Sequence, residues 1–302
     1  MSASNVTTPP VRSPAPPAPA QMISITPTRS VLAASRSALW ALIVRDLVVV
    51  WKHKVEFVIR VLIQPFLLVF VFLYVFPHIG QTVGGGGKVS ESHFATVLIP
   101  GVVGISIMFQ GIQAVALQLS QEFGYTREIE DRVQAPCPIW LVAASKVLSG
   151  AMQGLLAAVI VFPIAAVVHA PGVHAHLSVT WWVVLTLIPL ACVTMTSLGL
   201  LLGTAFEPRN IGLMFGFIVL PLTFLGGTYY QWTRLSPVTV HGIHWLQIIV
   251  LVNPLIYVNE GLRAGLTHAS HMPLYVVYPV LTGFCALFLT LGLRKFSARV
   301  RS

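Results

Sequence analysis

The sequence predicts an all-α integral membrane protein. It has six transmembrane helices, an N-terminal interfacial amphipathic helix and a re-entrant helical hairpin before the last span. Hydrophobic residues make up 56% of the 302 residues and charged residues only 9%, whereas a soluble domain carries about 25% charged residues. The apolar residues form continuous runs near the ~20 residues that cross a bilayer as a helix. Continuous runs favour helices over a barrel, whose strands alternate apolar and polar residues.

Residues 1–35 are predicted to be a disordered cytoplasmic tail. Seven prolines lie among Ala, Ser and Thr residues there, and such a segment buries too little apolar surface to order itself. The tail also lacks the apolar core of a signal peptide. We expect residues 36–302 to form one transmembrane domain.

A helix over residues 37–53 is predicted to lie in the membrane interface. Six apolar residues share one arc at helical spacing, with Arg45 and Lys52 on the other side: Leu39, Trp40, Ile43, Leu47, Val50 and Trp51. Tryptophans and cations suit the headgroup boundary. The alternative, that this segment is an early part of the first span, stays open.

Six spans follow, and their flanking charges predict the orientation. The spans are Val55–Phe76, Phe94–Leu117, Ile139–Val168, Val179–Ala205, Ile211–Gly227 and Pro273–Leu293. With the N-terminus inside, 15 of the 18 Lys and Arg residues fall on the cytoplasmic side. The positive-inside rule therefore places both termini in the cytoplasm. We expect a multi-pass protein of a bacterial inner (plasma) membrane.

The most heavily charged run lies between the second and third spans. It holds Glu122, Arg127, Glu128, Glu130, Asp131 and Arg132 within eleven residues. Charges this dense belong in water, because each costs about 2.5–3.5 kcal/mol in hydrocarbon. A free helix of this length is marginal in water. We therefore expect another protein to dock on the stretch from Leu119 to Lys146, which contains this run.

Residues 228–272 read as a re-entrant segment. Two moderately apolar pieces, about 242–252 and 254–266, are too short to cross a bilayer. Glu260 and Arg263 are three residues apart and share a helical face, which predicts a structural ion pair. The residues of interest in this segment are Tyr229, Tyr230, Trp232, Asn253, Pro254, Tyr257, Glu260 and Arg263.

Gln110 and Gln113 are candidates for a transport pathway on the second span. Together with Gln118 and Gln121 they fall on an arc of about 140° at 100° per residue. Hydrogen bonding between helices of the bundle explains such glutamines equally well, so both interpretations stay open.

No motif for enzyme, metal or nucleotide chemistry is recognisable. The run from Gly84 to Lys88 lacks both the first glycine and the Ser or Thr of a P-loop. The three cysteines show no metal spacing, and the ten histidines are scattered. The net charge of +9 is spread among apolar segments and forms no basic face for nucleic acid. We expect no cofactor in this chain.

Three patches resemble the permease subunit of ABC-2 type transporters, a family that includes daunorubicin-resistance, nodulation-factor and polysaccharide export permeases. They are QEFGYTREIEDRVQAPCPIW (121–140), FLGGTYYQWTRLSP (224–237) and NPLIYVNEGLRAG (253–265). The likeness covers about residues 37–295. Gln231 stands where the family commonly has a proline, and Ser236 separates Leu235 from Pro237.

The resemblance implies a dimer with a second permease, identical or paralogous, and two copies of a cytoplasmic ABC ATPase that bind ATP and Mg. Residues 119–137 correspond to the family's coupling helix. Its ATPase-coupling residues here would be Glu122, Phe123, Arg127, Glu128, Glu130, Asp131 and Arg132. The implied function is export of an amphiphile, which could be a lipid, a glycolipid or a drug, as in multidrug efflux and antibiotic resistance.

Two other classes of function remain open on the residues alone. An ATPase-independent secondary transporter or channel is disfavoured because the deep spans lack ion-coupling acids. A structural membrane scaffold would have no use for a re-entrant segment.

Overall fold

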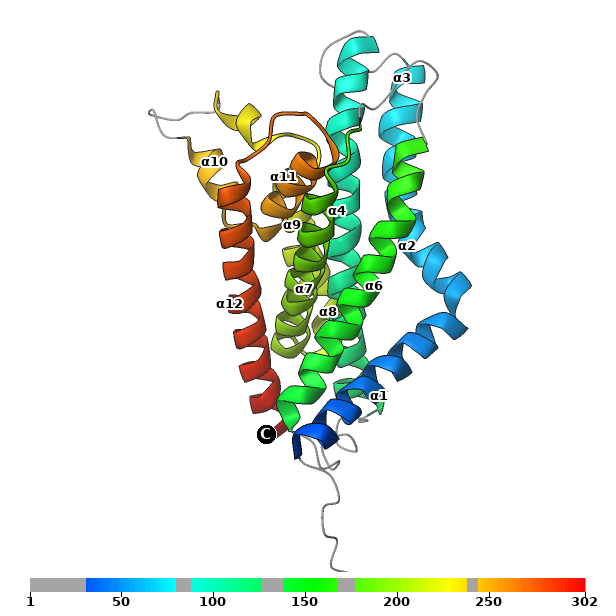
Figure 1. The fold of residues 1–302 in the computed structure, drawn as a ribbon, viewed down its shortest axis with the longest axis vertical. Coiled ribbons are helices and arrows are strands. Elements are labelled where there is room, and N and C mark those ends of the chain that lie inside the picture. Colours follow the sequence, from blue (N-terminus) through cyan, green and yellow to red (C-terminus); the bar gives the residue numbers. More distant parts are fainter. Residues whose placement is uncertain (1–30, 80–87, 127–137, 168–176, 238–243, 302) are drawn as a thin grey trace, which may run out of the picture.

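The structure is a bundle of long helices, described here from a computed structural model for residues 31–79, 88–126, 138–167, 177–237 and 244–301 (Figure 1). The tail prediction for residues 1–35 falls almost wholly outside these ranges. The elements, in chain order, are α1 (Val31–Lys52), α2 (Lys54–Val69), η1 (Phe70–Val75), α3 (Phe76–His78), α4 (Lys88–Gln121), η2 (Glu122–Thr126), α6 (Ile139–Val167), α7 (Trp181–Ala205), η3 (Pro208–Asn210), α8 (Ile211–Met214), η4 (Phe215–Val219), α9 (Leu220–Leu225), η5 (Trp232–Leu235), α10 (Trp245–Val250), α11 (Pro254–Leu266) and α12 (Leu274–Arg301).

Six helical stretches are long and apolar enough to cross a membrane, as the sequence predicts. They are Lys54–Val75, Ser92–Gly124, Ile139–Ile164, Trp181–Ala205, Pro208–Leu225 and Leu274–Val300. The largest departure concerns the second span, which was expected to end at Leu117. Its helix continues to Gln121 and then into η2, so the beginning of the charged run extends the span.

The centre of the bundle is α4, which packs against α2, α6, α7 and α11. Close packing is possible because glycines face the neighbouring helices. A Cβ on Gly104 would lie 1.9 Å from the Asn259 side-chain oxygen, and a Cβ on Gly199 would lie 2.9 Å from the Gly111 carbonyl. Small residues at such contacts let helix backbones approach one another in a membrane.

The outer helices carry the exposed apolar side chains that a lipid-facing surface requires. Phe217, Phe224 and Tyr275 are 79%, 61% and 79% exposed. Water disfavours so much exposed apolar surface, and hydrocarbon accepts it. This pattern supports the membrane assignment independently of helix length.

The N-terminal helix α1 runs obliquely across one end of the bundle and meets α2 at an elbow (Figure 1). The residues of the predicted apolar arc differ in burial. Ile43 is buried at 2% exposure, whereas Trp40 and Trp51 are 65% and 72% exposed. An interfacial position for α1 stays a prediction.

We call the end of the bundle that holds Gln121 and the last turn of α12 the basal end, drawn at the bottom of Figure 1, and the opposite end the apical end.

Candidate functional site

A buried ion pair at the basal end joins the two helices on either side of the charged run. Lys146 Nζ lies 2.5 Å from Glu122 Oε1, and the two side chains are 2% and 9% exposed. Glu122 belongs to η2, which extends α4, and Lys146 lies two turns into α6. The pair therefore fixes both helices from which residues 127–137 depart. Because the Glu122 carboxylate is buried against Lys146, Glu122 is part of the folded bundle.

Phe123 connects one further helix, α12, to this ion pair. Its ring meets that of Phe296 edge-on, with 6.0 Å between ring centroids. The Arg299 guanidinium lies 4.5 Å from the centroid of the Phe123 ring, a cation–π contact. Phe296 and Arg299 both lie on the last turns of α12.

Arg299 also caps the end of α7. It donates hydrogen bonds to the backbone oxygens of Gly203, Thr204 and Phe206 at 3.3, 3.0 and 2.9 Å. A cation at the carbonyl end of a helix satisfies orphan acceptors and opposes the helix dipole. We call Glu122, Phe123, Lys146, Phe296 and Arg299 the basal frame, since they connect α4, α6, α7 and α12.

Sequence reasoning found only part of the basal frame. The missed residues are Lys146, Phe296 and Arg299. Lys146 gave a usable signal, because a lone charge inside an apolar run must find a partner. The other predicted coupling residues, Arg127, Glu128, Glu130, Asp131 and Arg132, lie outside the described residues.

The two candidate glutamines of α4 have different surroundings. Gln110 is 4% exposed, and its amide nitrogen donates to Gln153 Oε1 of α6 at 3.2 Å. This contact matches the packing interpretation. Gln113 lines a cavity of about 300 Å³ between the elbow of α1 and α2 and the basal half of α4, which leaves it available to a ligand.

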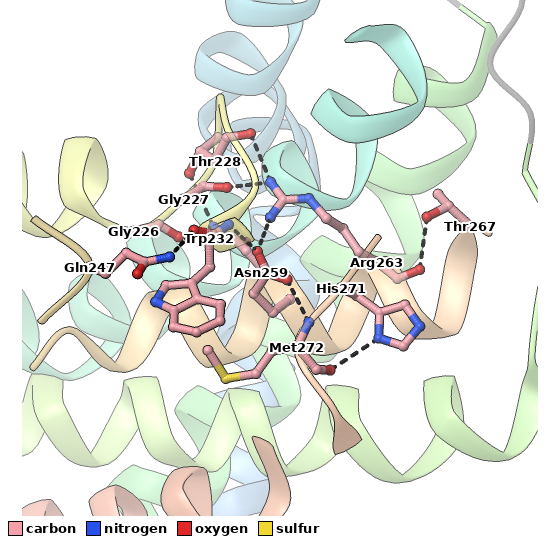
Figure 2. A network of polar contacts seen from close by, with 11 residues as sticks. Gly226, Gly227, Thr228, Trp232, Gln247, Asn259, Arg263, Thr267, His271 and Met272 are labelled. Carbon is pink, nitrogen blue, oxygen red and sulfur yellow. Dashed lines mark hydrogen bonds and ion pairs between the residues drawn. The ribbon is translucent and has the colours of Figure 1, made fainter. Parts of the chain in front are cut away.

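At the apical end, the predicted ion pair of Glu260 and Arg263 is present and fully buried. Their side chains are 0% exposed, and Arg263 Nη1 donates to Glu260 Oε1 at 2.8 Å. The same carboxylate accepts the backbone N–H groups of Trp232 at 2.8 Å and Met272 at 2.9 Å. Figure 2 shows this polar network, in which α11 binds the chain that follows α9 and the chain that precedes α12.

Arg263 and Asn259 secure the turn after α9. Arg263 Nη2 donates to the Gly227 oxygen and to Thr228 O at 3.4 Å. Asn259 Nδ2 donates to Gly226 O at 2.7 Å. Burial lowers the pKa of the Arg263 guanidinium from its ordinary value, and the Glu260 carboxylate opposes that shift. The turn itself depends on Gly227, whose φ of +67° disfavours any side chain.

The remaining residues of the predicted re-entrant segment make structural contacts. Asn253 caps α11 by accepting the Leu255 N–H at 2.9 Å, Pro254 is the first residue of that helix, and the Tyr257 hydroxyl donates to Leu251 O at 3.0 Å. A Pro after an Asn cap is a strong helix start.

The predicted aromatic residues pack on the neighbouring spans. The Tyr229 ring lies 5.5 Å from that of Phe72, and the Tyr230 hydroxyl donates to Phe224 O at 3.2 Å. Neither contact suggests a ligand.

In the described part of the chain, no three His, Cys, Asp or Glu side chains gather as a metal site requires.

Comparison with known proteins finds similar membrane transport proteins. The family model for the ABC-2 type transporter matches residues 37–267. The inner membrane transport permease YadH of Escherichia coli strain K12 is 28% identical over 248 residues, which cover 79% of this chain and 90% of YadH. The protein of the same name in Shigella flexneri gives the same values.

Proposed function

Because the chain belongs to the ABC-2 type transporter family, we propose that this membrane transport subunit is the permease of an ATP-driven exporter. It moves an amphiphile (a drug, a lipid or a glycolipid) out of the cytoplasm. A separate ABC ATPase, in two copies, binds ATP and Mg and supplies the energy. A second permease, identical or paralogous, completes the pathway.

One observation carries this proposal: the basal frame anchors the charged run at both sides. Residues 127–137 contain three acids and two arginines and depart from helices held together by a desolvated ion pair. A force applied to this run reaches α4 and α6 directly through Glu122 and Lys146. Charged residues in such a run confer register and specificity on docking, and rigid-body tilting of spans follows from ATPase closure.

The basal end is the cytoplasmic end in this proposal. Lys146, Arg209, Arg294 and Arg299 lie on the basal parts of their elements, which agrees with the positive-inside rule. YadH is named as an inner membrane protein, and we assign this chain to the same kind of membrane with both termini in the cytoplasm. In this orientation α10 and α11 enter the outer part of the membrane and return.

The experiment is ATP-dependent transport by the purified complex. Vesicles that contain both subunits should accumulate a labelled amphiphile only when ATP is present on the ATPase side. A Walker-A lysine variant of the ATPase should abolish accumulation. Transport that persists without ATPase would instead favour the secondary transporter or channel.

A further inference from the structure

The outer side of α12 carries two cations near its basal end. α12 packs against α6, α7 and α11 and lies at the edge of the bundle in Figure 1. Phe296 marks its inner side, because it is fully buried. Gly292 lies on the same side, and a Cβ there would lie 3.0 Å from a methyl carbon of Leu200. Arg294 lies on the opposite side of the helix and Lys295 on its flank, and both are exposed.

The position of these cations along α12 matches the basal boundary of the hydrocarbon. Tyr275 is 79% exposed at the apical beginning of α12, and exposed tyrosines are typical of the boundary between membrane and water. Lys295 follows Tyr275 by 20 residues, which is a helix length of about 30 Å. The hydrocarbon core of a bilayer is also about 30 Å thick. With Tyr275 at one boundary, Arg294 and Lys295 therefore lie among the lipid head groups at the other.

The protein does not neutralise these two charges in the part of the chain that the structure describes. Neither Arg294 nor Lys295 belongs to an ion pair there. Glu207, which follows the basal end of α7, pairs instead with Arg209 at 2.7 Å. Cations at the level of the head groups attract anionic lipids. An arginine can donate two parallel hydrogen bonds to a phosphate, and a lysine adds a point charge.

The neighbours of the two cations fit the other parts of a phospholipid. Leu287 and Leu291 precede the cations on the outer side of α12 and are 49% and 39% exposed, so they can contact an acyl chain. Ala298 lies one turn beyond Arg294 and is exposed, and its small side chain leaves space for a head group. The outer side of α12 is thus apolar, then cationic, then small, in the order of acyl chain, phosphate and head group.

An ATPase is the other partner that exposed cations at the basal end could meet. The leucines argue for a lipid, because Leu287 and Leu291 lie one and two turns inside the hydrocarbon boundary, where a soluble protein does not reach. A large exposed apolar surface beside the cations suits a ligand that has both a charged and an apolar part.

We propose that Arg294 and Lys295 bind the phosphate of an anionic phospholipid in the leaflet at the basal end, with its acyl chain against Leu287 and Leu291. The bound lipid stabilises the basal frame from outside, because Phe296 and Arg299 lie on the same last turns of α12. This site goes beyond the proposed export function and does not depend on it.

The test measures lipid retention by native mass spectrometry on the purified full chain without ATPase. Phosphatidylglycerol and phosphatidylethanolamine with identical acyl chains are offered in turn, and the wild type should retain phosphatidylglycerol better. The double variant Arg294→Gln/Lys295→Gln should retain phosphatidylglycerol at least about tenfold less, because both charges are lost. Phosphatidylglycerol should also raise the melting temperature of the wild type more than that of the double variant.

The matched control is Lys88→Gln/Arg234→Gln, which removes two cations from the apical beginning of α4 and from η5. This control should retain phosphatidylglycerol as the wild type does. The single variant Lys295→Gln covers the case in which the double variant misfolds, and it should also lower retention of phosphatidylglycerol.

Equal retention of phosphatidylglycerol by the wild type and both α12 variants overturns the proposal, and so does a wild-type preference for phosphatidylethanolamine. Release of the lipid by an equal concentration of inorganic phosphate would show a site for a free anion instead. Loss of ATPase from the double variant during affinity purification, with unchanged lipid retention, would assign the cations to the ATPase. Failure of the export function would appear only as ATP-independent transport in vesicles, which this binding assay does not measure.

Discussion

Lys146 Nζ and Glu122 Oε1 are 2.5 Å apart in the interior of the basal end, although 24 residues separate them in the chain. The contact joins the end of the most buried span to the beginning of the next. The contact also holds together the two helices that residues 127–137 connect, so both ends of the charged run are attached to the bundle.

Removing one member of this pair should destabilise the fold. Lys146→Met leaves a buried carboxylate without its main partner, which costs about 3–5 kcal/mol. The double variant Glu122→Gln/Lys146→Met should recover part of the loss because no charge is then buried alone. Thermal unfolding of the purified protein measures both effects. Losses that simply add in the double variant would contradict the pairing.

Removing one member of the apical ion pair, Glu260 and Arg263, should also destabilise the fold. Here the replacement of Glu260 must also keep its hydrogen bonds to the backbone. Arg263→Ala should lower stability by about 3–5 kcal/mol, because Glu260 is then a lone buried charge. Adding Glu260→Gln should restore more than adding Glu260→Ala, since the glutamine oxygen can still accept one of the two backbone N–H groups that Glu260 now accepts. The yield of monodisperse protein and its melting temperature report the order. Equal recovery by the two second-site changes would argue against the backbone contacts.

The contact between α4 and α11 should not tolerate a side chain on the glycine. Gly104→Ala places a methyl group 1.9 Å from the Asn259 side-chain oxygen, which should cost about 1–3 kcal/mol through strain. Gly216→Ala is a useful control, since nothing lies within 4 Å of its Cβ position. Unfolding midpoints of the two variants should differ, and matching midpoints would mean that α11 can move away at no cost.

Much of the fold follows from composition, because a run of about twenty apolar residues has one stable solution in a bilayer. The side-chain partners do not follow in the same way. Glu260 and Arg263 were predictable because they are three apart on one helix. Lys146 pairs with Glu122, 24 residues away in the chain, and Arg299 binds the end of α7 from 93 to 96 residues away. Spacing along the sequence contains no record of such contacts.

The glutamines of α4 illustrate the same limit at the candidate site. Gln110 and Gln113 lie on one arc of the helix, but one faces α6 and the other a cavity. Whether a glutamine on this arc faces a helix or a cavity depends on how the neighbouring helices pack against α4. The extension of α4 into η2 was missed for a related reason, since the charge of Glu122 predicted water and its buried partner was unknown.

Topology should follow the distribution of basic residues. In a chain whose native cysteines are replaced by alanine, a cysteine at Gly85 should react with an impermeant thiol reagent added outside cells. A cysteine at Gln134 should react only after the membrane is opened, because residues 119–137 are assigned to the cytoplasm. The labelled fraction on intact and opened cells gives the answer. The opposite pattern would reverse the orientation and remove the docking surface from the ATPase.

The docking of an ATPase on residues 127–137 is tested most directly by its retention during affinity purification of the tagged permease. The charge-reversal variant Glu128→Arg/Asp131→Arg changes residues outside the buried pair, so insertion and yield should equal the wild type. Loss of desolvated charge contacts costs about 2–5 kcal/mol, which should lower ATPase retention tenfold or more. Glu91→Arg, at the other end of α4, should keep the full complement. If the double variant retains as much ATPase as the wild type, the charged run is not the docking site.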